Sequence, residues 1–330
     1  MSLQNKKTGI LFVQLGTPDE ATPKAVRRYL KEFLWDRRVV DLNRVLWFFI
    51  LNGIILTFRP KKSAALYKRF FEKHGPTLRL YSESLTQKIA TLFKAQSENF
   101  VVAYGMRYGN PSLKKVFADL VDTQNCSQIL VVPLFPQFCF ATTGSVFDAV
   151  MTNLQLVSKN IKTRIIGPIH QNKLYMESLT KIINEKIKAV PDYERLIVSY
   201  HGIPERYVNN GDPYFKMCTQ TTELLSQHIN FPKDKIMQCF QSRFGKEEWL
   251  KPYTDVTIES LAHQGVKKIA VVCPSFSMDC LETLDEIGEE CQELFLENGG
   301  EKLDLISCLN DHDFWVGNFH QLLTEELVKM

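Results

Sequence analysis

Eight short apolar runs alternate with longer stretches of helical pattern along the whole chain. Most of these runs are continuously apolar, which is typical of strands buried on both faces, and the stretches between them suit βαβ crossovers. The sequence therefore predicts an α/β protein with parallel sheets. The predicted strands span residues 9–14, 100–104, 129–134, 163–166, 196–200, 236–240, 268–272 and 303–307.

The runs form two sets of four, and the segments that follow the strands look alike in the two sets. Three pairs of similar segments occur in the same order: QLGTP (14–18) with YHGIP (200–204), GMRYG (105–109) with QSRFG (241–245), and VVPLF (131–135) with VVCPSF (271–276). We interpret this order as an internal duplication that produces two doubly wound domains facing each other. Ligands of open α/β sheets bind beyond the carboxyl ends of the strands, where these segments lie.

The length of 330 residues agrees with two domains. We expect the first over residues 1–175 and the second over 176–310. A helix at 311–330 is expected to pack back on the first domain.

Composition and missing motifs exclude several classes of protein. The net charge of +3, from 40 basic and 37 acidic side chains, disfavours a nucleic-acid binder. The eight cysteines are scattered singly, and none is spaced as the ligands of a zinc site are. We therefore expect them to be the reduced thiols of a cytosolic protein. No secretory signal, membrane span, GxGxxG, GxxxxGK[ST] or GxSxG pattern occurs in the sequence.

The first crossover contains an unusual apolar stretch. Residues 45–58 are nearly all apolar, Arg44 precedes them, and RPKK (59–62) follows. The stretch is too short to cross a bilayer. It is either a buried helix, or an exposed apolar lip (about 45–62) that dips into a membrane surface with basic residues near the headgroups, or the wall of a pocket for a large flat ligand.

His201 directly follows the predicted strand 196–200, before a turn that Gly202 and Pro204 impose. A neutral imidazole at such a strand end can accept a proton near pH 7 or bind a divalent metal, although a single histidine is also often structural. Glu282 is expected beside the same edge, in the first turn of the helix that follows strand 268–272.

Glu286 and Glu290 continue from Glu282 at four-residue spacing. They are either part of the site or an ordinary solvated helix face, because the opposite side of the same helix is apolar. Gly288 inside this helix marks a local irregularity, since glycine weakens a helix interior.

Other residues at strand ends suit a planar acidic ligand. Arg107 offers the fork of donors that binds carboxylates, or else forms a salt bridge between the domains. Apolar and aromatic side chains near the same edges are individually typical of a core but together suit a planar ring: Leu15, Tyr67, Trp249 and Phe276.

Seven motifs resemble the ferrochelatase family, and within it the bacterial protoporphyrin ferrochelatases, in order and across nearly the whole chain. They are QLGTP (14–18), residues 105–111, PLFPQFCFATTG (133–144), SYHGIP (199–204), GDPY (211–214), FQSRFG (240–245) and residues 274–286.

The resemblance implies that ferrous iron is inserted into protoporphyrin IX, with release of two protons, as the last step of haem synthesis. It implies two similar Rossmann-like, chelatase-type domains, each a four-stranded parallel sheet flanked by helices, with the cleft between them. By motif position, His201 accepts a pyrrole proton and contacts the metal, Glu282 carries metal or protons, and Glu286 and Glu290 form the path away from the site. The implied porphyrin contacts are Leu15, Arg59, Tyr67, Arg107, Tyr108, Trp249, Phe276 and Asp279.

The sequence also departs from the family pattern. Cys280 stands where many relatives have histidine, which leaves the role of this position open. The animal enzymes hold an iron–sulfur cluster, but Phe140 occupies one ligand position here and the last cysteine is Cys308, so we predict no cluster and no permanently bound cofactor.

The expected partners are protoporphyrin IX, Fe²⁺ as a substrate, the inner-membrane surface through the apolar lip, and the preceding oxidase of the porphyrin pathway. The expected location is the cytoplasm, with peripheral attachment to the inner membrane. Two alternatives are a ferrochelatase that acts on coproporphyrin III and a non-catalytic porphyrin or haem carrier. A periplasmic-type ligand binder is disfavoured by the absence of a signal sequence.

Overall fold

A computed structural model describes residues 7–157, 159–245 and 247–330. The chain divides into two compact units. Unit 1 comprises residues up to Leu134, Cys139–Gly167 and His320–Met330, and unit 2 comprises Phe135–Phe138 and Pro168–Phe319. The main change from unit 1 to unit 2 therefore falls at residue 168, slightly before the position expected from the sequence.

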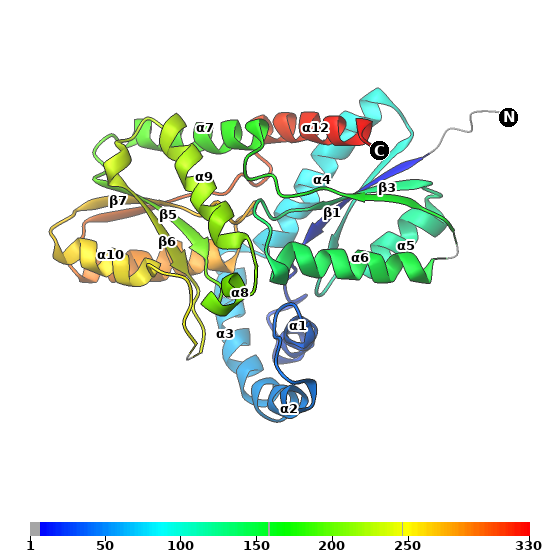
Figure 1. Ribbon diagram of the computed structural model, residues 1–330. Coiled ribbons are helices and arrows are strands. Elements are labelled where there is room, and N and C mark those ends of the chain that lie inside the picture. The colour runs from blue at the N-terminus through cyan, green and yellow to red at the C-terminus, as the bar shows by residue number, and fades with distance from the viewer. Residues whose placement is uncertain (1–6, 158, 246) are drawn as a thin grey trace. The chain divides into compact units, whose positions relative to one another are not determined.

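Unit 1 is built on a four-stranded parallel sheet (Figure 1). Its strands are β1 (Thr8–Gln14), β2 (Phe100–Met106), β3 (Gln128–Pro133) and β4 (Lys162–Ile165), in the spatial order β2-β1-β3-β4. β1 lies between β2 and β3 and is buried along its whole length. Its continuous apolar run is therefore explained by burial on both faces.

Unit 2 repeats this arrangement. Its strands are β5 (Arg195–His201), β6 (Ile236–Gln241), β7 (Lys268–Val272) and β8 (Lys302–Ile306), in the order β6-β5-β7-β8. All neighbouring strands are parallel. All eight predicted strands and the prediction of two similar parallel sheets are confirmed, and the identical strand order agrees with an internal duplication.

Helices connect the strands of each unit. In unit 1 these elements are α1 (Pro23–Trp35), α2 (Arg44–Phe49), η1 (Ile50–Ile55), α3 (Leu56–His74), α4 (Thr77–Gln96), α5 (Leu113–Ala118), η2 (Asp119–Thr123), η3 (Phe140–Gly144) and α6 (Ser145–Leu156). In unit 2 they are α7 (Lys173–Ala189), α8 (Glu205–Asn209), α9 (Tyr214–His228), η4 (Lys233–Lys235), α10 (Thr254–His263), η5 (Leu281–Cys291) and α11 (Gln292–Glu297). The last helix, α12 (Asp313–Val328), begins in unit 2 and ends in unit 1, where the His320 ring lies 4.5 Å from that of Phe93.

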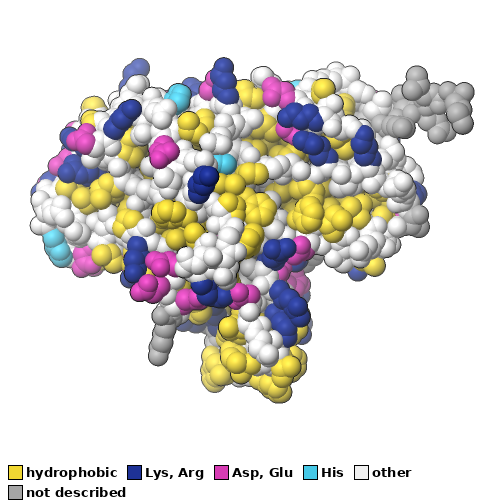
Figure 2. Space-filling view, in the orientation of Figure 1, with side chains coloured by type: hydrophobic (Ala, Val, Ile, Leu, Met, Phe, Trp, Pro, Cys, Tyr) yellow, Lys and Arg dark blue, Asp and Glu magenta, His cyan; other side chains and the backbone are white. Residues whose placement is uncertain are grey.

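The apolar lip, residues 45–62, lies in a part of unit 1 that extends away from the sheet, formed by α1, α2, η1 and α3 (Figure 1). Hydrophobic side chains gather at its tip (Figure 2). The most exposed are Val45 (69%), Phe49 (66%) and Phe58 (71%). Trp47 and Leu51, in contrast, are buried against α1. The lip is therefore not a buried helix, because one face packs on α1 and the other is open.

The described residues contain no helix that is both long enough and apolar enough to span a membrane.

Candidate functional site

His201 is the last residue of β5 and is partly buried. Its main-chain N–H donates to Ser275 Oγ at 3.1 Å, which ties the strand end to the loop after β7. Its ring Nδ1 lies 2.6 Å from the carbonyl oxygen of Gly202. Because a carbonyl oxygen only accepts, Nδ1 carries the proton, and Nε2 of the neutral ring keeps a lone pair that can bind a proton or a metal.

Two aromatic side chains that the sequence singled out lie near this imidazole. The ring of Trp249 lies 6.5 Å from it and that of Phe276 6.2 Å, both between centroids. Trp249 is held by a 2.8 Å hydrogen bond from its indole N–H to the carbonyl of Phe244. Two flat apolar surfaces of the kind that packs on a planar ligand therefore lie beside the imidazole.

Glu282 is the second residue of η5, an eleven-residue π-helix. Helices of this type are rare and frequently occur at functional sites. The irregularity expected at Gly288 lies within it. Nε2 of Gln241 donates to the main-chain carbonyl of Glu282 at 2.5 Å, and Gln241 is paired in register with His201. The structure thus brings the histidine strand and the glutamate helix to the same edge of the sheet.

Glu286, one turn further along η5, is partly buried. Its carboxylate accepts hydrogen bonds from Ser242, from the main-chain N–H at 2.7 Å and from the hydroxyl. Burial raises the pKa of Glu286 above its ordinary value, although the Ser242 hydroxyl and the nearby His201 oppose this rise. Glu286 is therefore not part of a solvated face.

A cavity of about 250 Å³ adjoins this carboxylate, and Glu290, which is exposed, also lines it. Asp255 and Arg243 also line it and form an ion pair at 2.8 Å. The cavity is therefore lined both by the partly buried Glu286 and by exposed polar residues.

Cys280 caps η5, and its side chain accepts a hydrogen bond from the main chain of Thr283. Burial, and then the charge and hydrogen bonding of the neighbouring Glu282, raise the pKa of its thiol well above the ordinary value. The thiol is therefore protonated at neutral pH and is a poor metal ligand.

Asp279 is only 3% exposed. Its carboxylate accepts hydrogen bonds from the Thr283 hydroxyl at 3.0 Å, the Cys308 N–H at 3.2 Å and the Asn310 amide at 2.7 Å. These contacts favour a structural role, in which Asp279 holds the loop before η5.

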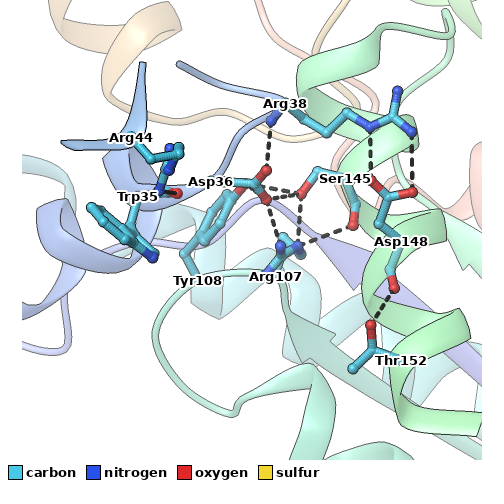
Figure 3. Close-up of polar contacts among 9 residues, drawn as sticks. All are labelled: Trp35, Asp36, Arg38, Arg44, Arg107, Tyr108, Ser145, Asp148 and Thr152. Carbon is cyan, nitrogen blue, oxygen red and sulfur yellow. Dashed lines mark hydrogen bonds and ion pairs between the residues drawn. The ribbon is translucent and has the colours of Figure 1, made fainter. Parts of the chain in front are cut away.

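Arg107 and Tyr108 follow β2 and belong to a polar network in unit 1 (Figure 3). Asp36 is at its centre: its carboxylate accepts hydrogen bonds from Arg107 at 2.5 Å, Tyr108 at 2.8 Å and Ser145 at 2.6 Å. Tyr108 is 1% exposed. Arg107 and Tyr108 thus fasten the chain segment that follows α1, and sequence reasoning did not identify Asp36 or Ser145 as their partners.

Burial disfavours the charged form of Asp36. The hydrogen bonds from Ser145 and the Arg38 main chain, together with the charge of Arg107, outweigh that effect and hold the pKa of Asp36 below its ordinary value. Arg38 is itself bound by both oxygens of Asp148, at 2.7 and 3.1 Å.

The remaining predicted porphyrin contacts lie in or near the apolar lip. Leu15 and Tyr67 are partly buried and pack against the cluster that contains Trp47. Burial lowers the pKa of the Arg59 guanidinium, and the nearby Tyr67 opposes that effect. The structure thus gathers Leu15, Arg59 and Tyr67 in one region of unit 1.

Within residues 7–157, 159–245 and 247–330, no group of three or more His, Cys, Asp or Glu side chains is arranged to hold a metal ion.

The family model of ferrochelatase matches residues 7–327 of this chain. A ferrochelatase of Photobacterium profundum is 43% identical over 325 residues, which cover 98% of each chain. A ferrochelatase of Vibrio cholerae is 45% identical over 307 residues, which cover 93% of this chain and 94% of the relative. Another relative, ferrochelatase 1 of Shewanella oneidensis, is 45% identical over 319 residues.

Solved structures agree in fold. SirB from Bacillus subtilis with Fe³⁺ aligns with a TM-score of 0.57 at 15% identity, over 97% of this chain and 95% of its own. CbiX, the terminal enzyme for siroheme biosynthesis in denitrifying bacteria, aligns with a TM-score of 0.52 at 11% identity, over 97% and 99%. The match of the family model along almost the whole length, together with the relatives at over 40% identity, shows that this chain belongs to the ferrochelatase family.

Proposed function

We propose that this protein inserts ferrous iron into protoporphyrin IX and releases two protons, the last step of haem synthesis. Membership of the ferrochelatase family supports the insertion of iron into a porphyrin. The observation that carries the assignment of residues is the bond from His201 Nδ1 to the Gly202 carbonyl, because it makes Nε2 the ring nitrogen that is available to a proton or a metal when the ring is neutral, and the rings of Trp249 and Phe276 lie near this imidazole.

His201 acts as the acceptor of a pyrrole proton and as a contact of the incoming metal. Metal insertion requires both pyrrole N–H groups to lose their protons, so a base must reach the centre of the macrocycle. An imidazole titrates near neutral pH and is also a good ligand for a divalent metal. The Gly202 carbonyl stabilises the imidazolium that forms, since Nδ1–H already points toward it.

Glu282 carries the metal or the proton at the start of η5, and Glu286 and Glu290 continue the path. The raised pKa of Glu286 makes its carboxyl a better proton acceptor near neutral pH than an exposed glutamate is. The adjoining cavity, of about 250 Å³, gives this path its opening.

The residues that bind the macrocycle are Leu15, Arg59, Tyr67, Trp249 and Phe276. Arg59 suits a propionate, because a guanidinium offers paired donors to a carboxylate. For Arg107, Tyr108 and Asp279 the contacts support a structural role instead, because Arg107 and Tyr108 donate to Asp36, and Asp279 accepts from Asn310.

The test is the absorbance of protoporphyrin IX with ferrous iron, without oxygen, in the presence and absence of the protein. Conversion to the haem spectrum is expected only with the protein. His201→Ala should lower turnover by at least about a hundredfold with little change in porphyrin binding, as the loss of a general base does.

His228→Ala is the matched control for the histidine variant. His228 is exposed, and its Nδ1 likewise bonds a carbonyl, that of Leu224 at 2.8 Å. The control should keep full turnover.

Porphyrin binding without uptake of iron or zinc by the wild type would instead identify a carrier. A preference for coproporphyrin III in a competition assay would identify the other ferrochelatase class.

The apolar lip attaches the protein to the cytoplasmic face of the inner membrane. Its exposed aromatic side chains stand beside basic ones, the combination that binds an interface with anionic lipid. Phe49→Glu and Phe58→Glu should each weaken sedimentation with anionic liposomes. Leu156→Glu, a similar change at an exposed position of α6 outside the lip, should not; equal effects at all three sites would refute the attachment.

Two further expectations stay predictions: the absence of an iron–sulfur cluster and the contact with the preceding oxidase of the pathway. The visible absorbance of the purified protein tests the first of them. Co-sedimentation with the purified oxidase tests the second.

A further inference from the structure

Gln241, the last residue of β6, connects the strand of His201 to the helix of Glu282. It is 4% exposed and pairs in register with His201. Its Oε1 accepts a hydrogen bond from the Ser199 hydroxyl, on β5, at 2.8 Å. Its Nε2 donates to the Glu282 carbonyl at 2.5 Å, so one buried amide joins β5 to the first turn of η5.

Further contacts fix the amide of Gln241 itself. The Ser199 hydroxyl, which is fully buried, also bonds the hydroxyl of Thr254 at 2.8 Å. These contacts determine which end of the Gln241 amide faces η5, because a hydroxyl donor on Oε1 leaves the two N–H groups of Nε2 for the helix. Nε2 also lies 3.5 Å from Oε2 of Glu286.

Ser242, the next residue, holds the second turn of η5. Its main-chain N–H donates to Oε1 of Glu286 at 2.7 Å, and its hydroxyl donates to Oε2. Ser242 has a φ of +66°, in the left-handed region that non-glycine residues seldom adopt. Such strained backbone persists only where its surroundings fix it, and it clusters at functional sites.

We propose that Gln241 and Ser242 form a clamp that positions η5, so that the carboxyl groups of Glu282 and Glu286 are held at the strand end that carries His201. The inference rests on the proposed function, and it assigns the two residues a positioning role. The clamp fixes Glu282 through its main chain and leaves its carboxylate unconstrained by this amide, whereas it fixes Glu286 through the carboxylate itself.

Two substitutions of Ser242 separate positioning from stability. Ser242→Ala and Ser242→Gly both remove the hydroxyl and keep the main-chain N–H. They differ in backbone freedom, because glycine adopts a φ of +66° readily and alanine does not. The glycine variant should therefore melt at a higher temperature than the alanine variant. Both should lose about tenfold in the kcat of zinc insertion, as expected when a reacting group is misplaced.

Gln241→Met tests the other half of the clamp, and Gln238→Met is its matched control. Gln238 lies on the same strand, but its amide donates to Thr219, away from η5, at 3.4 Å. The Gln241 variant should lose at least tenfold in kcat while the dissociation constant for protoporphyrin stays within twofold. Gln238→Met should leave both the kcat and the dissociation constant for protoporphyrin unchanged. Full turnover in Ser242→Gly, or equal turnover in the two glutamine variants, would overturn the proposal.

Hydrogen exchange gives a readout that does not depend on turnover. The amides of residues 281–287 should exchange at least tenfold faster in Gln241→Met and in both Ser242 variants than in the wild type or in Gln238→Met. Unchanged protection would overturn the clamp even if turnover fell. A wild type that inserts no metal, but whose clamp variants show the faster exchange, would refute the proposed function and leave the clamp standing.

Discussion

Replacing Asp36 with asparagine tests how firmly the network in Figure 3 anchors the segment that leads from α1 to the apolar lip. The carboxylate receives three side-chain donors on Oδ2 and the Arg38 N–H at 2.7 Å on Oδ1. An asparagine amide must turn its own N–H groups toward one of these two sets of donors. The variant therefore leaves the Arg107 charge without its partner and at least one buried donor without an acceptor.

The size of the loss follows from burial. Breaking a buried ion pair by removing one partner costs about 3–5 kcal/mol. The side chains of Asp36 and Arg107 are 9% and 23% exposed, so some water reaches the arginine and the lower end, about 3 kcal/mol, is expected. Asp148→Asn is the control, because it breaks an arginine–carboxylate pair whose partners are 39% and 49% exposed. It should cost less than about 1 kcal/mol.

Urea unfolding of the wild type and of both variants measures these free energies. Because the pKa of Asp36 is lowered in the folded protein, its ionised form stabilises the fold above the unfolded value of about 3.9. That stabilisation is lost only as the pH falls through the lower, folded value. The difference between wild type and Asp36→Asn should thus stay constant from about pH 5 to 8 and shrink below about pH 4. Equal losses in the two variants, or a difference that changes near pH 7, would refute the reasoning.

Three further outcomes are expected. At pH values above the raised folded pKa of Glu286, Glu286→Gln should be more stable than the wild type. The protonated carboxyl stabilises the fold at low pH, and this contribution disappears as the pH rises through the folded pKa. Unfolding at about pH 5 and about pH 8 measures the change. Gly202→Ala should cost roughly 1–3 kcal/mol and alter the fluorescence of Trp249, since the new methyl group would lie 2.9 Å from the Gln241 carbonyl oxygen and 3.3 Å from the indole. All eight cysteines are buried and free, so a thiol reagent such as DTNB should react slowly with the native protein and with eight equivalents after unfolding; rapid reaction at neutral pH would contradict their burial.

The strands and their two-fold repetition could be predicted from the sequence because the signal is local. The predicted strand 268–272, which is apolar from Ile269 onward, matches β7 residue for residue. The position of His201 was also predictable, since a histidine that follows such a run must lie at the carboxyl end of a parallel sheet.

The partners of the predicted residues could not be derived in the same way. Arg107 and Asp36 are 71 residues apart, and no periodic pattern in the sequence connects them. The sequence also predicted an ordinary α-helix for the glutamates, whereas residues 281–291 form a π-helix. Apart from Gly288, nothing in these residues indicates i→i+5 hydrogen bonding. Whether Gln241 was a core residue or a bridge depended on three-dimensional neighbours that only the fold supplies.

The identical order of strands in the two sheets has a consequence for how such a chain diverges. Two separate copies of one gene product would share every substitution, so a change useful at one strand end would also appear at the equivalent strand end of the other copy. Here both copies are encoded in tandem, and each accumulates its own changes. β5 of unit 2 ends on His201, whereas Leu15 follows the equivalent β1 of unit 1, and the apolar lip lies in the crossover after β1. Two similar sheets within one chain can therefore carry different residues at equivalent strand ends, which two identical chains cannot do.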